Sequence, residues 1–65
     1  MDVREALKEA RAEKGMSYNT VGRMAGCYSE TVRKLELGLG GVTLEKAEEI
    51  LNVLGYDIVA VKRKE

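Results

Sequence analysis

The sequence predicts an all-α domain of four short helices, followed by one short C-terminal β-strand. Apolar residues recur at helical spacing in four successive segments. A capping residue precedes each segment and a glycine follows it, as expected at the two ends of a helix. The 65 residues suffice for a single domain (1–65), with a core at 2–55 and a strand and tail at 56–65.

The first helix is expected from Asp2 to Lys14. Asp2 is a favourable N-cap, and Gly15 is well suited to end a helix. The apolar residues of this segment form one stripe that is expected to face the core: Val3, Ala6, Leu7 and Ala10.

A second and a third helix are expected on either side of a turn at Gly26. The second follows the N-cap candidate Ser17, and the third begins at residue 28 or 29 and ends before Gly38. The small Gly22 lets the two helices cross closely. The residues expected to face inward are Val21, Met24 and Ala25 on the second helix, and Val32 and Leu35 on the third.

A glycine-rich loop at 38–42 precedes the fourth helix, which Thr43 is expected to cap and Gly55 to end. Five residues of this helix recur at core-facing spacing: Leu44, Ala47, Ile50, Leu51 and Leu54.

The segment at 56–61 is rich in β-branched residues and is expected to be a strand. A lone strand leaves its backbone N–H and C=O groups unpaired, and no second strand is visible in the sequence. We therefore expect it to pair antiparallel with the same strand of a second copy, about a two-fold axis. The alternative is a frayed or helix-packed tail. The residues expected at the dimer contact are Tyr56, Ile58, Val59 and Val61.

The residue inventory argues against an enzyme, a metal site and a cofactor. Cys27 is the single cysteine and histidine is absent, which excludes an internal disulfide and a Cys/His zinc site. The Gly-Leu-Gly-Gly segment lacks the lysine and the flanking strand of a phosphate-binding loop. No apolar run is long enough to span a membrane, and the charged N-terminus is not a signal peptide. A cytoplasmic protein is expected.

The formal net charge is zero, with 11 basic and 11 acidic residues, which by itself disfavours binding to nucleic acid. The charges are nevertheless segregated along the chain. Residues 23–42 carry three basic and two acidic residues, whereas residues 43–57 carry one basic and four acidic residues. The middle of the chain is thus weakly basic, and the fourth helix is acidic.

Two short helices joined by a tight glycine-containing turn form a helix-turn-helix. The outer face of the second of these helices is polar, and a DNA major groove is wide enough to admit such a helix. Arg33 is the best-suited residue to read guanine, although a phosphate contact or a solvated side chain is the alternative. Glu30 is suited to accept from cytosine or to repel phosphate.

Four segments in matching order carry a family resemblance: LKEARAEKGMS, VGRMAG, ETVRKLELG and TLEKAEEILNVLGY. From about Leu7 to Tyr56 the chain resembles the Cro/C1-type (XRE-like) helix-turn-helix regulators of phages and bacteria. The resemblance implies a lambda-repressor-like fold and sequence-specific binding of double-stranded DNA. It also implies a transcriptional regulator, expected here to be a homodimeric repressor that inserts its third helix into the major groove of a palindromic operator.

The resemblance also implies individual roles. Arg11 and Glu36 occupy the positions of a buried ion pair between the first helix and the end of the third. Ser17 and Tyr18 occupy positions that contact phosphate. The full set of expected DNA-binding residues is Ser17, Tyr18, Arg23, Tyr28, Ser29, Glu30, Thr31, Arg33 and Lys34.

The chain departs from the family pattern at several of these positions. Tyr18 replaces a favoured glutamine, and Tyr28 replaces a serine or threonine cap. Gly22 replaces the usual alanine, at a cost of up to about 1 kcal/mol in helix stability. Leu37 and Leu39 stand where polar or basic residues commonly bind phosphate.

A second function stays open at this point. The uncharged loop and the sequence pI of about 6.3 also suit a protein-binding module. Such a module, for example an antitoxin or an anti-repressor, would use the same scaffold to bind a protein partner such as a toxin.

Overall fold

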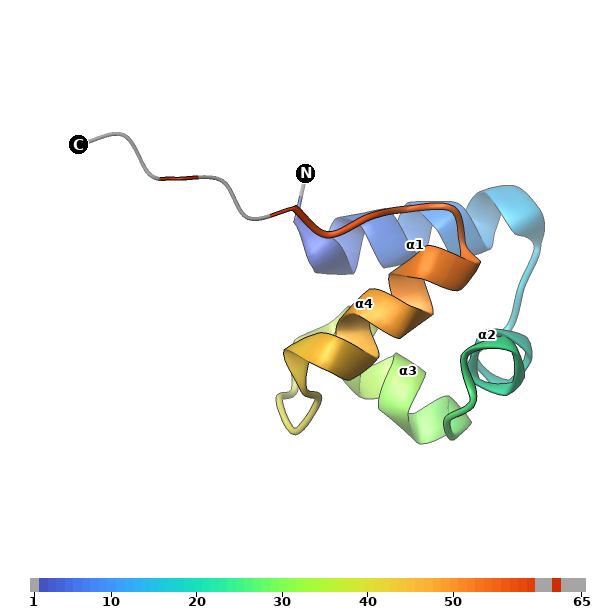
Figure 1. The fold of residues 1–65 in the computed structure, drawn as a ribbon. Helices are drawn as coiled ribbons and strands as arrows, with labels where there is room; N and C mark the ends of the chain where they lie inside the picture. Colours follow the sequence, from blue (N-terminus) through green and yellow to red (C-terminus); the bar gives the residue numbers. More distant parts are fainter. Residues whose placement is uncertain (1, 60–61, 63–65) are drawn as a thin grey trace.

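The computed structural model describes residues 2–59 and 62, and within them the chain forms the four predicted helices (Figure 1). These are α1 (Val3–Lys14), α2 (Tyr18–Ala25), α3 (Ser29–Leu37) and α4 (Leu44–Val53). The all-helical prediction is therefore confirmed. No helix among the described residues is long and apolar enough to cross a bilayer.

Three of the helices begin at a side-chain cap. The side chains of Asp2, Ser17 and Thr43 each accept a hydrogen bond from the backbone N–H three residues later, at 3.0, 3.1 and 3.1 Å. These bonds satisfy donors that a helix start leaves without a partner. α3 differs, because its N-cap Tyr28 makes no side-chain hydrogen bond to the helix.

The core lies where the four helices meet. Its buried residues come from every helix: Ala6, Leu7, Ala10, Val21, Val32, Ile50, Leu51 and Leu54. Ala25 and Leu35, both expected inside, are half-buried against this cluster.

Two inward assignments were wrong. Met24 is 47% exposed, because the core-facing stripe of α2 runs through Tyr18, Val21 and Ala25 and leaves Met24 beside it. Leu44 is 72% exposed, since it opens α4 one turn before the first buried residue of that helix.

The described part of the C-terminal segment, residues 56–59, forms no strand in the single chain. The chain turns back after α4 (Figure 1), and the Tyr56 N–H donates to the Leu51 carbonyl at 2.9 Å. Tyr56 and Ile58 then pack against the core, whereas Asp57 and Val59 are exposed. Residues 60 and 61, including Val61, lie outside the described residues. The predicted pairing requires a second copy of the chain and stays a prediction.

Candidate nucleic-acid interface

α2 and α3 are packed closely through the turn that joins them. The Cys27 N–H donates to the Gly22 carbonyl at 2.8 Å. A Cβ atom at Gly22 would lie 2.8 Å from the Cys27 carbonyl oxygen, closer than such atoms approach in proteins. The backbone of the turn therefore lies too close to α2 to leave room for a side chain at position 22.

α3 separates an apolar face from a polar face. Val32 is fully buried and Leu35 is half-buried against the core. Tyr28, which precedes the helix, is 84% exposed, and Ser29, Glu30 and Arg33 are also exposed. Thr31 and Lys34 lie at the border between the two faces and are half-buried. Of the six residues expected on this segment, four are thus exposed (Tyr28, Ser29, Glu30 and Arg33) and two are half-buried (Thr31 and Lys34).

An ion pair lies on the exposed face of α3. Nη1 of Arg33 is 3.2 Å from Oε2 and 3.4 Å from Oε1 of Glu30, one helical turn earlier. The two side chains remain 45% and 58% exposed. Glu30 and Arg33, for both of which a base contact is suggested by the sequence, therefore contact each other in the free protein.

Two further residues of the expected DNA-binding set, Ser17 and Arg23, lie at the two ends of α2. Ser17 is exposed, and its hydroxyl also shares a hydrogen bond with the Thr20 hydroxyl at 3.1 Å. Arg23 is exposed in the last turn of α2. The described part of the chain therefore leaves both Ser17 and Arg23 open to solvent.

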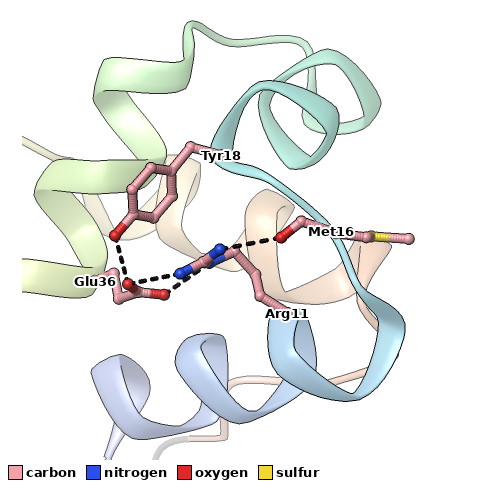
Figure 2. A network of polar contacts seen from close by, with 4 residues as sticks. All are labelled: Arg11, Met16, Tyr18 and Glu36. Carbon is pink, nitrogen blue, oxygen red and sulfur yellow. Dashed lines mark hydrogen bonds and ion pairs between the residues drawn. The ribbon is translucent and has the colours of Figure 1, made fainter.

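A polar network ties α1 to the end of α3 (Figure 2). Nε and Nη2 of Arg11 donate to the two carboxylate oxygens of Glu36 at 2.8 and 2.9 Å, and Nη1 donates to the Met16 carbonyl at 3.0 Å. The Glu36 side chain is 7% exposed. Such a two-pronged contact is the strongest geometry for an arginine–carboxylate pair. Arg11 and Glu36 are the two residues for which the resemblance implies a buried ion pair.

Tyr18 belongs to this network, which the sequence did not indicate. Its hydroxyl donates to Oε2 of Glu36 at 2.5 Å, and its ring lies over the Arg11 guanidinium at 4.2 Å (Figure 2). The hydroxyl proton is thereby committed to Glu36, so the resting side chain presents no donor to a phosphate. The tyrosine in place of the family's favoured glutamine is the one sequence signal that could have indicated this role.

The hydrogen bonds within the network shift three pKa values. Bonding to the Arg11 guanidinium lowers the pKa of Glu36, and donation to Glu36 raises the pKa of Tyr18. The hydrogen bonds between Arg11 and Glu36 also raise the pKa of Arg11. Each shift favours the protonation state that keeps the network intact.

The family model of the helix-turn-helix matches residues 7–61, which is most of the chain. The chain belongs to the helix-turn-helix family. This is the same Cro/C1-type family that the sequence resembles. Its members are DNA-binding regulators. The match includes α2, α3 and the turn between them.

One relative of this helix-turn-helix protein comes from Aeropyrum pernix, and its name provisionally describes it as an HTH-type transcriptional regulatory protein. The two sequences are 33% identical over 55 residues, which are 85% of this chain. The matched region spans 17% of the length of that relative. No solved structure matches the chain.

Proposed function

We propose that the protein is a sequence-specific transcriptional regulator that inserts α3 into the major groove of double-stranded DNA. One observation carries the proposal: α3 buries Val32 on one side and exposes polar side chains on the other. A helix with its side chains is about 10–12 Å across, which fits a major groove about 12 Å wide. The exposed side of α3 is therefore free to enter the groove while its buried side is held by the core.

In this proposal one group of residues contacts the bases and another group contacts the phosphates. Arg33, Glu30, Ser29 and Tyr28 face the base edges, since the N-terminal part of a recognition helix usually contacts bases. The phosphate contacts come from the flanks of this surface, where charge and hydrogen bonding position the protein without reading sequence. The flanking residues are Ser17, Arg23, Thr31 and Lys34.

Tyr18 takes a different part in this proposal from the one that the resemblance implies. Its hydroxyl donates to Glu36, so it supports the position of α2 against α3 and does not donate to a phosphate. This supporting role is favoured because the hydroxyl proton is hydrogen-bonded to Glu36, whose side chain is only 7% exposed.

The regulator is further proposed to act as a dimeric repressor at a palindromic operator. A dimer places two recognition helices about 34–36 Å apart, in successive major grooves on one side of the DNA. The contact between the copies uses the extended segment after α4. Its residues alternate between packed (Tyr56, Ile58) and exposed (Asp57, Val59), as in a strand with one face on its own core. Bound at a promoter, the dimer blocks the polymerase sterically.

Selection of bound sites from random double-stranded DNA tests this function. We expect one palindromic sequence to be enriched and its binding to weaken steeply as salt is raised, because phosphate contacts release counterions. Absence of DNA binding at low salt would overturn the proposal. Enrichment of a single half-site by a monomer would overturn the dimeric part alone.

A protein-binding module, such as an antitoxin or an anti-repressor, is the second candidate. Three exposed leucines at the ends of the α3–α4 loop favour it: Leu37, Leu39 and Leu44 are 48%, 59% and 72% exposed. Apolar side chains here suit a protein partner better than a phosphate. Co-purification of one defined partner by a protein that does not bind DNA would favour this function over the first.

A further inference from the structure

The ion pair between Glu30 and Arg33 changes the charge of the surface that is proposed to face DNA. α2 and α3 carry three basic residues, Arg23, Arg33 and Lys34. Within the described residues, Arg33 alone among them has a carboxylate within ion-pair distance. An exposed pair of this kind adds little to stability. Its main effect is therefore to offset the positive charge of Arg33 on the exposed side of α3.

The donors of Arg33 are divided between two edges of its guanidinium. Both contacts to Glu30 come from Nη1, at 3.2 and 3.4 Å. Nε and Nη2 make no hydrogen bond to the described part of the chain, and they form the other edge of the planar group. Two donors side by side match the O6 and N7 acceptors of guanine in the major groove. Arg33 is therefore able to keep its contact with Glu30 and still bind a guanine through two hydrogen bonds.

A phosphate and a guanine respond differently to the carboxylate. A phosphate carries a full negative charge and is repelled by Glu30, whereas the guanine edge is uncharged overall. Attraction to phosphate depends on the net local charge of the protein. Glu30 therefore weakens any contact of Arg33 with phosphate more than a contact of Arg33 with guanine.

We propose that Glu30 determines sequence specificity through Arg33, by keeping the guanidinium away from phosphates and presenting its free edge to a guanine. Glu30 is thus a positioning residue, and the DNA site read by α3 contains a guanine contacted by Arg33. This inference rests on the proposed function, and it names the base and the residue pair that set the preference.

The substitution Glu30→Gln tests the inference. Binding is measured to a duplex that carries the selected site and to an unrelated duplex of the same length. We expect affinity for the unrelated duplex to rise about fivefold to tenfold near 0.1 M salt, because Arg33 gains one phosphate contact, and the salt slope to steepen by about 0.9. Affinity for the selected site should rise less, so the ratio of the two affinities falls.

Glu48→Gln is the matched control, since it removes the same charge from an exposed residue of α4. It is expected to change binding to both duplexes by the same small factor. In the Arg33→Ala background, Glu30→Gln should raise affinity for both duplexes by the same factor and leave the ratio of the two affinities unchanged, because the residue through which Glu30 acts on specificity is absent. Circular dichroism checks that every variant is folded.

Two outcomes would overturn the inference alone: an affinity ratio unchanged by Glu30→Gln, or the same effect of Glu30→Gln with and without Arg33. Failure of the unsubstituted protein to bind any duplex at low salt would overturn the proposed function and the inference together. The two failures are therefore distinguishable in one set of titrations.

Discussion

The hydroxyl of Tyr18 donates a hydrogen bond of 2.5 Å to Oε2 of Glu36. The same carboxylate accepts two further hydrogen bonds from Arg11, so α1, α2 and α3 meet at one charged side chain that is only 7% exposed. A buried carboxylate is costly unless hydrogen bonds and an opposite charge surround it. The placement of α3 against the other helices therefore depends on side chains that do not face the proposed DNA surface.

Tyr18→Phe should lower the free energy of unfolding by about 1–2 kcal/mol, because it removes one hydrogen bond to a charged acceptor. The ring over Arg11 and the Arg11–Glu36 pair are retained, which keeps the loss moderate. Chemical denaturation measures the change. Tyr28→Phe is the control, since Tyr28 is 84% exposed, and should shift stability by less than about 0.5 kcal/mol. Equal effects of the two substitutions would contradict this account of the network.

Stability should fall in acid because the bond to Arg11 lowers the pKa of Glu36 from its usual 4.5. A group whose pKa is lowered by folding stabilises the folded state fully above its unfolded pKa. That contribution is lost as the pH falls below about 4.5 and through the folded-state pKa. Denaturation at a series of pH values measures the loss, which Glu36→Gln should reduce and Glu48→Gln should leave in place. An identical pH profile for Glu36→Gln and the unsubstituted protein would argue against this assignment.

Gly22→Ala should destabilise the protein, although alanine favours helices by up to about 1 kcal/mol. The new Cβ would lie 2.8 Å from the Cys27 carbonyl oxygen, so the backbone of the turn would have to move. Overpacking of this kind costs about 1–3 kcal/mol, and we expect a net loss of about 1 kcal/mol. Asn19→Ala, at an exposed position of the same helix, provides the comparison for helix propensity alone. A more stable Gly22→Ala variant would show that the turn adjusts without strain.

Arg33→Ala should relax the preference for one base pair of the selected site, at a cost of about 1–3 kcal/mol in binding, if Arg33 contacts guanine through two hydrogen bonds. Competition among duplexes substituted at each position measures this. Arg23→Ala, at the end of α2, is expected to weaken binding to all sequences evenly, because a phosphate contact carries no base preference. An unaltered operator preference in Arg33→Ala would refute the base-reading role of Arg33.

Val59→Asp should weaken dimerisation while leaving the folded monomer largely intact. Val59 is 72% exposed in the single chain, so the substitution removes little packing within one copy. At a contact between two copies it would place two like charges close together. Analytical ultracentrifugation measures the dimer, and Val59→Thr, which keeps the β-branched shape, should behave like the unsubstituted protein. A Val59→Asp protein that remains fully dimeric would rule out the strand contact.

The helices were predictable from the sequence because their signals are local. Asp2, Ser17 and Thr43 cap helices as expected, and the spacing of apolar residues located most of the core. The errors arose where burial depends on the neighbouring helices. Met24 and Leu44 have suitable spacing, but no other helix covers them. Periodicity identifies the side of a helix that is apolar, whereas the other helices determine how much of that side is buried.

For the candidate interface, the residue types and their order along the chain were enough to indicate which side of α3 is polar, since a helix places every third and fourth residue on one side. The sequence did not, however, indicate which residues contact one another across different helices. Tyr18 and Glu36 are 18 positions apart and meet only after α1, α2 and α3 have packed. Hydrogen bonding over such a separation depends on the relative placement of whole helices, which is why the role of Tyr18 emerged from the folded chain.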